Sequence, residues 1–136
     1  EMPTKPMNMY AATKVFGEAT AHYFAYAEGL STIVVRVGSF EGNQEVVEPE
    51  ARTLSAFISK RDMCHLLERC IEVENVQYAL LQAVSDNRFK RMDITSTRAE
   101  VGYEPLDDAF ELFGIGIPNR QRWYEENPRR ERKRQA

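Results

Sequence analysis

Two long segments of the chain space their apolar residues as helices do. Residues 9–27 are rich in alanine and are followed by Gly29, which favours a helix end there. Gly17 inside this segment costs up to about 1 kcal/mol relative to alanine, so we expect it to pack closely against another backbone. A second helix is expected to begin at Ser59, with Asp62 three residues later as a variant of the capping box. Its apolar residues recur at helical spacing: Met63, Leu66, Leu67, Cys70 and Ile71.

Two shorter segments have the apolar character of strands. Residues 32–37 are mostly β-branched and almost continuously apolar, which predicts a strand buried on both faces. Residues 78–84 form the second predicted strand. Because helices and strands alternate along the chain, the pattern predicts an α/β layer whose sheet is completed by further strands.

The remaining segments predict loops and short helices. Residues 38–53 are rich in glutamate and are expected to be irregular. A short helix is expected over residues 95–101, stopped by Gly102. Asp107 or Asp108 is a candidate cap for one further short helix.

Composition narrows the class of protein. The 136 residues have the length of one domain, 43% are hydrophobic, and no apolar run approaches the about 18 residues of a membrane span. Cys64 and Cys70 lie six apart on one predicted helix and face different directions, so we expect reduced core thiols in a cytoplasmic protein. Neither they nor His22 and His65 have the spacing of metal ligands.

Charge is concentrated at one end of the chain. Residues 129–136 are strongly basic, whereas the rest of the chain is acidic and the net charge is −3. A basic tail can bind nucleic acid, but the acidic body and the lack of interleaved aromatic residues favour a solvated, disordered tail. We therefore expect neither a nucleic-acid partner nor a membrane partner.

Tyr10 and Lys14 are the candidate chemical groups. They stand four residues apart at the head of the first predicted helix, so both side chains lie on one face, one turn from each other. A neighbouring ammonium favours the ionised form of a phenol. Such a pair can act as an acid/base toward a hydroxyl or a carbonyl. On spacing alone, a simple surface contact between the two side chains explains the pattern as well.

Further motifs follow this pair in order along the chain. They are Tyr-x-x-x-Lys-x-x-Gly-Glu from residue 10, Arg-x-Gly-Ser from residue 36, Arg-x-Leu-Ser from residue 52, and a helix start near residue 59. From about residue 9 to about residue 110, this series resembles the extended short-chain dehydrogenase/reductase family, also called the NAD-dependent epimerase/dehydratase family. Within that family it is most similar to uronate dehydrogenase-like enzymes.

The resemblance implies a fold and a missing part. It predicts the C-terminal part of a Rossmann-like doubly wound α/β fold, with residues 1–128 as the catalytic and substrate-binding portion. The seven glycines of this chain form no Gly-x-Gly-x-x-Gly series, the fingerprint that lets the backbone approach a pyrophosphate. We therefore expect a chain without the N-terminal nucleotide-binding half, inactive on its own.

The resemblance also implies roles for four residues. Tyr10 would take a proton from a sugar hydroxyl while a hydride passes to NAD or NADP, and Lys14 would hold the ribose hydroxyls and favour the phenolate. Ser39 and Arg52 match substrate-contacting positions, and a guanidinium suits a carboxylate. From the residues alone, Ser39 is equally explained by a strand-end turn, and Arg52 by a surface position.

Some positions depart from that pattern or invite a structural explanation. Arg36 lies in a predicted buried strand, and a structural salt bridge is its favoured role. Asp86 and Asn87 are expected to form a turn. Arg91 and Met92 stand where the relatives carry aromatic residues, which leaves the shape of the substrate pocket open.

Two alternatives to a uronate dehydrogenase-like enzyme remain open. One is a nucleotide-sugar epimerase or dehydratase that uses the same Tyr and Lys. The other is a non-catalytic remnant that self-associates or binds a partner. Family members usually dimerise through the helix that carries the Tyr, and a homodimer is expected because this helix is apolar beyond one stripe. The residues concerned are Val15, Phe16, Ala19, Tyr23 and Tyr26.

Overall fold

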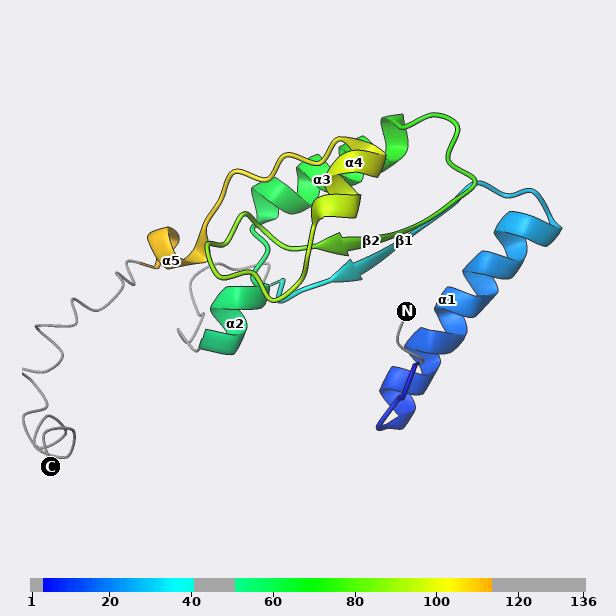
Figure 1. Ribbon diagram of the computed structural model, residues 1–136, viewed down its shortest axis with the longest axis horizontal. Helices are drawn as coiled ribbons and strands as arrows, with labels where there is room; N and C mark the ends of the chain where they lie inside the picture. The colour runs from blue at the N-terminus through cyan, green and yellow to red at the C-terminus, as the bar shows by residue number, and fades with distance from the viewer. Residues whose placement is uncertain (1–3, 41–50, 114–136) are drawn as a thin grey trace, which may run out of the picture.

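The computed structural model describes residues 4–40 and 51–113 of the chain. These form an α/β arrangement of five helices and two strands within the described ranges (Figure 1). In chain order they are α1 (Met9–Ala27), β1 (Thr32–Val37), α2 (Ala51–Ala56), α3 (Lys60–Glu72), β2 (Tyr78–Ala83), α4 (Thr95–Val101) and α5 (Ala109–Leu112). The α/β class is confirmed, and so is the predicted order of the elements apart from α2, which was not expected. The basic tail, residues 129–136, lies outside the described residues, so the predicted boundary at 128 stays a prediction.

The two strands pair in parallel, with Thr32 opposite Tyr78 and Val37 opposite Ala83. A parallel pair needs a crossover connection, and here α2 and α3 lie between the strands in the sequence. Figure 1 shows α3 and α4 along one side of the strands and α1 on the other side. The sheet therefore has two faces with different neighbours.

One face of the sheet carries the main hydrophobic core. The odd-numbered residues of both strands, apart from Val37 at the end of β1, pack against α3 and α4, because side chains alternate along a strand. Leu66 of α3, Val101 of α4 and Tyr103 are almost completely buried there. The strand residues that join this core are Ile33, Val35, Ala79, Leu81 and Ala83.

The other face is covered less completely. On this face Val34 of β1 is half-buried and Arg36 is exposed. The prediction that this strand is buried on both faces is therefore wrong for the described residues. The reason is that α1 is the only described helix on that face, and it leaves part of the strand uncovered.

One position on the outer edge of β2 is capped by a side chain. Thr97 of α4 is buried, and its Oγ1 accepts a hydrogen bond from the N–H of Gln82 at 2.9 Å and donates one to the carbonyl of Gln82 at 3.0 Å. One hydroxyl thus satisfies both backbone groups that point away from β1.

The ends of the helices follow the sequence signals. Asn8 caps α1 by accepting a hydrogen bond from the N–H of Ala11 at 2.8 Å, and Gly29 beyond its end has a φ of 70°. Gly102 ends α4 with a φ of 68°, and Asp108 caps α5, as predicted. Gly17 contradicts its prediction, because a Cβ built there would meet no atom of the described residues within 4 Å.

Ser59 caps α3, but the predicted return contact is absent from the described structure. Its Oγ accepts a hydrogen bond from the N–H of Asp62 at 3.0 Å. The buried carboxylate of Asp62 instead accepts hydrogen bonds from the N–H groups of Leu106 and Asp107, at 2.9 and 3.1 Å. The N–H of Ser59 donates to Ser85 Oγ at 3.0 Å. Asp62 therefore ties a distant loop to α3 rather than completing the capping box.

Two further predictions need correction. The segment expected to be irregular up to residue 53 contains the start of α2. Cys64 is exposed on the outer side of α3 and is not a core thiol, while Cys70 is half-buried and burial raises its pKa. Among the described residues, no helix is both long enough and apolar enough to cross a membrane.

Candidate functional site

The head of α1 places Tyr10 and Lys14 side by side, as their spacing predicts. The ammonium of Lys14 lies 5.1 Å from the centre of the Tyr10 ring, a cation–π distance. Tyr10 is 71% exposed, so its hydroxyl is open to a ligand. The two groups that define the candidate chemistry are therefore together and accessible.

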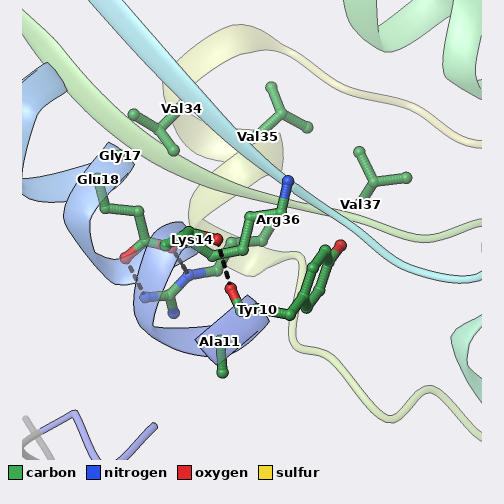
Figure 2. A pocket seen from close by; sticks show the side chains of 10 residues that line it. Tyr10, Ala11, Lys14, Gly17, Glu18, Val34, Val35, Arg36 and Val37 are labelled. Carbon is green, nitrogen blue, oxygen red and sulfur yellow. Dashed lines mark hydrogen bonds and ion pairs between the residues drawn. The ribbon is translucent and has the colours of Figure 1, made fainter. Parts of the chain in front are cut away.

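A groove runs between α1 and β1 next to this pair. Its volume is about 840 Å³. Figure 2 shows the Tyr10 ring and the Lys14 side chain on the helical wall, with the valines of β1 opposite. The lining consists of Tyr10, Ala11, Thr13, Lys14, Gly17, Glu18, Val34, Val35, Arg36 and Val37. The groove is therefore apolar on the strand side apart from Arg36, and its other ionisable groups lie on the helix side.

A two-pronged ion pair crosses the groove between strand and helix. Arg36 Nε and Arg36 Nη2 each lie 2.7 Å from one carboxylate oxygen of Glu18 (Figure 2). The hydrogen bond from Arg36 lowers the pKa of Glu18, and the same bond raises the pKa of Arg36. The salt bridge expected for Arg36 is thus confirmed, and its partner comes from the helix that carries Tyr10 and Lys14.

Aromatic side chains continue this face of α1 toward its end. His22 lies 4.6 Å from Tyr26 and 5.0 Å from Tyr78 of β2, between ring centres. Desolvation raises the pKa of Tyr78, and the Glu18 carboxylate adds to the shift. The side of α1 that faces the sheet therefore combines small apolar residues such as Ala25 with charged and aromatic groups.

Ser39 lies at the junction after β1 and does not line the groove. Its N–H donates to the carbonyl of Ala56 at 2.7 Å, and its carbonyl accepts from the N–H of Ile58 at 3.0 Å. Gly38 permits this junction, since a Cβ there would lie 2.0 Å from the Ala56 carbonyl oxygen. The main chain of Ser39 thus has the strand-end position that the sequence offered as an alternative. A role in binding substrate stays a prediction.

Arg52 is exposed on α2 and also does not line the groove. Its carbonyl accepts a hydrogen bond from Ser55 Oγ at 3.0 Å, which stays within the helix. Within the described residues, the structure thus unites Tyr10 with Lys14 but does not bring Ser39 or Arg52 to them. The substrate role of Arg52 stays a prediction as well.

Glu18 and Asn87 make contacts that the sequence analysis did not predict. Glu18 follows Lys14 by one turn and Tyr10 by two, so it shares their helix face, and the structure makes it the partner that Arg36 needs. Asn87, expected only in a turn, is buried and joins two segments. Its Nδ2 donates to the Phe57 carbonyl at 2.8 Å, and its Oδ1 accepts from the N–H of Ala109 at 2.9 Å.

Two residues of the loop after β2, Arg91 and Met92, have different surroundings. Met92 packs against the main core and Arg91 is exposed. Met92 is therefore a packing residue of this fold. In the part of the chain that the structure describes, no three His, Cys, Asp or Glu side chains are grouped so as to hold a metal ion.

Comparison with protein families agrees with this geometry. The model of the NAD dependent epimerase/dehydratase family matches residues 1–68, which include Tyr10, Lys14 and Glu18. The match extends over half of the chain. The chain therefore belongs to the NAD dependent epimerase/dehydratase family, and the family predicted from the ordered motifs is confirmed.

The curated relatives include sugar dehydrogenases. An NAD-dependent glucose-6-phosphate dehydrogenase from Haloferax volcanii is 34% identical over 118 residues, which cover 87% of this chain and 44% of that protein. A uronate dehydrogenase from Pseudomonas syringae pv. tomato is 30% identical over 112 residues, 82% of this chain and 38% of that protein. The chain thus spans less than half the length of these relatives.

Solved structures share the fold. A mutated uronate dehydrogenase superimposes with a TM-score of 0.73 at 23% identity, over 88% of this chain and 42% of that one. A Tyr-to-Ala mutant of uronate dehydrogenase from Agrobacterium tumefaciens, complexed with NAD, gives a TM-score of 0.68 at 26% identity, over 88% and 46%. The chain therefore has the fold of part of a Rossmann-like dehydrogenase, as predicted.

Proposed function

We propose that this chain is the Tyr–Lys portion of an NAD(P)-dependent sugar oxidoreductase that resembles uronate dehydrogenases. The observation that carries the proposal is the exposed phenol of Tyr10 beside the Lys14 ammonium, on a groove about 840 Å³ in volume. Membership of an NAD-dependent family and sugar dehydrogenases among the relatives support it.

The groove suits one end of such a cofactor. An exposed phenol and an ammonium offer a donor and an acceptor for sugar and ribose hydroxyls, and the valines of β1 offer an apolar wall. The pyrophosphate end needs a Gly-rich turn, which is not present in the 136 residues. Residues outside this sequence would supply that turn, so we expect the chain to be inactive on its own.

The proposed reaction oxidises a sugar hydroxyl to a carbonyl. When bound, NAD or NADP supplies the hydride acceptor. Tyr10 Oη takes the proton of the sugar hydroxyl as that bond polarises, and Lys14 stabilises the phenolate while its ammonium holds hydroxyl groups in place. The base is thus provided by the helix, and the valines of β1 line the opposite wall of the groove.

Ser39 and Arg52 are the proposed substrate contacts. A guanidinium pairs with a carboxylate or a phosphate through two parallel hydrogen bonds. The relatives named for uronates and for glucose-6-phosphate act on sugars that carry such groups. Because neither residue lines the groove, this proposal requires that the bound sugar extend from Tyr10 toward the junction after β1.

The exposed apolar surface of α1 supports self-association. Its exposed large side chains are Met9, Tyr10, Phe16, Tyr23, Phe24 and Tyr26. Apolar area of this kind is typical of interaction surfaces, and a homodimer through α1 is the proposed assembly. A self-associating module without catalysis is the second candidate, since it needs only this surface. A cytoplasmic location also stays a prediction.

An activity assay tests the proposal. In the complete polypeptide that the gene encodes, we expect NAD reduction with galacturonate or glucuronate but no epimerisation of UDP-sugars. Tyr10→Phe should lower kcat by roughly 10²- to 10⁴-fold, the usual range for loss of a general acid/base.

Tyr23→Phe is the matched control, because it removes a hydroxyl from an exposed tyrosine elsewhere on α1. Equal activity of Tyr10→Phe and the parent contradicts the proposed base. Epimerisation of a UDP-sugar selects the epimerase alternative, and tight NAD binding by the 136-residue chain contradicts the incomplete cofactor site.

A further inference from the structure

Helix α1 is held firmly to the sheet at its far end. Ala25 is its one buried residue in the described structure, and its carbonyl accepts a hydrogen bond from Gln77 Nε2 at 3.0 Å. Tyr10 lies fifteen residues earlier, about 22 Å away along a helix axis at ~1.5 Å per residue. The head of the helix therefore lies far from the point at which α1 is fixed to the sheet.

The Glu18–Arg36 pair is the specific tie between these ends. Both carboxylate oxygens of Glu18 accept a hydrogen bond at 2.7 Å, so the fork fixes orientation as well as distance. Glu18 follows Lys14 by one helical turn, which places the tie directly beneath the candidate site. The side chains are 42% exposed in Arg36 and 20% exposed in Glu18, so solvent screens the attraction.

Because this distance is long, a small rotation of α1 moves Tyr10 by a large amount. A pivot of about 5° around Ala25 would displace Tyr10 by roughly 2 Å, given the ~1.5 Å rise per residue of a helix. A misplacement of about 1 Å at a reacting group can lower a rate roughly 10²-fold. A pair that adds little to stability can thus have a large effect on the site.

We propose that Glu18 and Arg36 are positioning residues that hold the head of α1 against β1, so that Tyr10 and Lys14 face the groove. The effect on catalysis rests on the proposed function. The effect on the placement of α1 does not, because it concerns only contacts within this chain.

The first experiment measures the placement of α1 by methyl NMR of the 136-residue chain. Contacts between α1 and the methyl groups of Val34 and Val37 report the position of the helix head. Glu18→Gln should weaken these contacts severalfold, and the exchange Glu18→Arg with Arg36→Glu should restore them, because it rebuilds the pair with the charges reversed. Glu72→Gln, which removes the partner of Arg69 on α3, is the control and should leave them unchanged.

The second experiment measures kinetics in the complete polypeptide. Glu18→Gln should lower kcat at least about 10-fold, with the KM for the sugar changed less than about 3-fold, and the exchanged pair should recover part of kcat. Unchanged methyl contacts in Glu18→Gln, or equal losses in Glu72→Gln, overturn the inference. A parent without dehydrogenase activity instead counts against the proposed function, and the methyl contacts still decide the role of the ion pair.

Discussion

The two faces of the sheet are built on different principles. The face toward α3 and α4 is closed by interlocking apolar side chains such as Leu66 and Leu81, which are fully buried. The face toward α1 is joined by an ion pair and aromatic contacts, and its valines remain open to the groove. The difference teaches that this chain separates stability from chemistry. One face supplies the folding energy, and the other leaves room for a ligand.

The largest expected effect lies at the seam between β1 and α2. In Gly38→Ala the new Cβ would lie 2.0 Å from the Ala56 carbonyl oxygen and 2.8 Å from Val84 Cγ1. A backbone oxygen cannot move as a side chain can, so we expect a loss of about 3 kcal/mol or more in the free energy of unfolding, measured by urea denaturation. A free energy of unfolding equal to that of the parent would show that β1 and α2 pack less closely than these distances indicate.

The next effect compares two neighbouring leucines on opposite faces of β2. Leu81→Ala removes a fully buried side chain and should cost about 3 kcal/mol, whereas Leu80→Ala removes a half-buried one and should cost about 1 kcal/mol. Denaturant midpoints of the two variants measure the difference. Equal losses would mean that the two faces are equally packed.

The ends of the elements were predictable from the sequence, but their neighbours were not. Local signals located several helix ends correctly, because Ser59, Gly29 and Gly102 act within a few residues of the chain. The burial of β1 depends instead on how much of its face other segments cover, which periodicity does not report. The apolar sequence of β1 predicts that its side chains can be buried, but it does not predict which segments cover them.

The candidate site shows the same division. Tyr10 and Lys14 were predictable because one helix holds both. The joining of Glu18 to Arg36 depends on the docking of a helix on a strand, so only the need of Arg36 for a partner was visible. The placement of Ser39 was fixed by the close approach of Gly38 to α2, a segment that the sequence pattern did not identify as helical.

A smaller effect tests the openness of the α1 face. Gly17→Ala adds a methyl group where no described atom lies within 4 Å, and alanine is the better helix former. We expect a gain of up to about 1 kcal/mol in the 136-residue chain, measured as a shift in the denaturation midpoint. A loss would reveal that another segment packs closely against this glycine.

The smallest expected effect is the loss of the Glu18–Arg36 contribution at low pH. The pKa of Glu18 is lowered in the folded chain by its hydrogen bond with Arg36, so the pair's contribution is present above the unfolded pKa of the glutamate, about 4.3. It is lost as the pH falls through the lowered, folded value. In the parent chain, amide exchange at the head of α1 should therefore rise below about pH 4 and approach the exchange seen in Glu18→Gln. Exchange in α3 should follow the same course in both chains. Identical pH profiles at α1 would contradict a working ion pair.

The hydroxyl of Thr97 has a consequence for how this sheet can grow. By occupying both backbone groups of Gln82, it blocks main-chain pairing with another chain at that point on the far margin of β2. A strand added on that side would lose its hydrogen bonds to Gln82. The flank of β1, beside the helix that bears the phenol and the ammonium, carries no such penalty from Thr97.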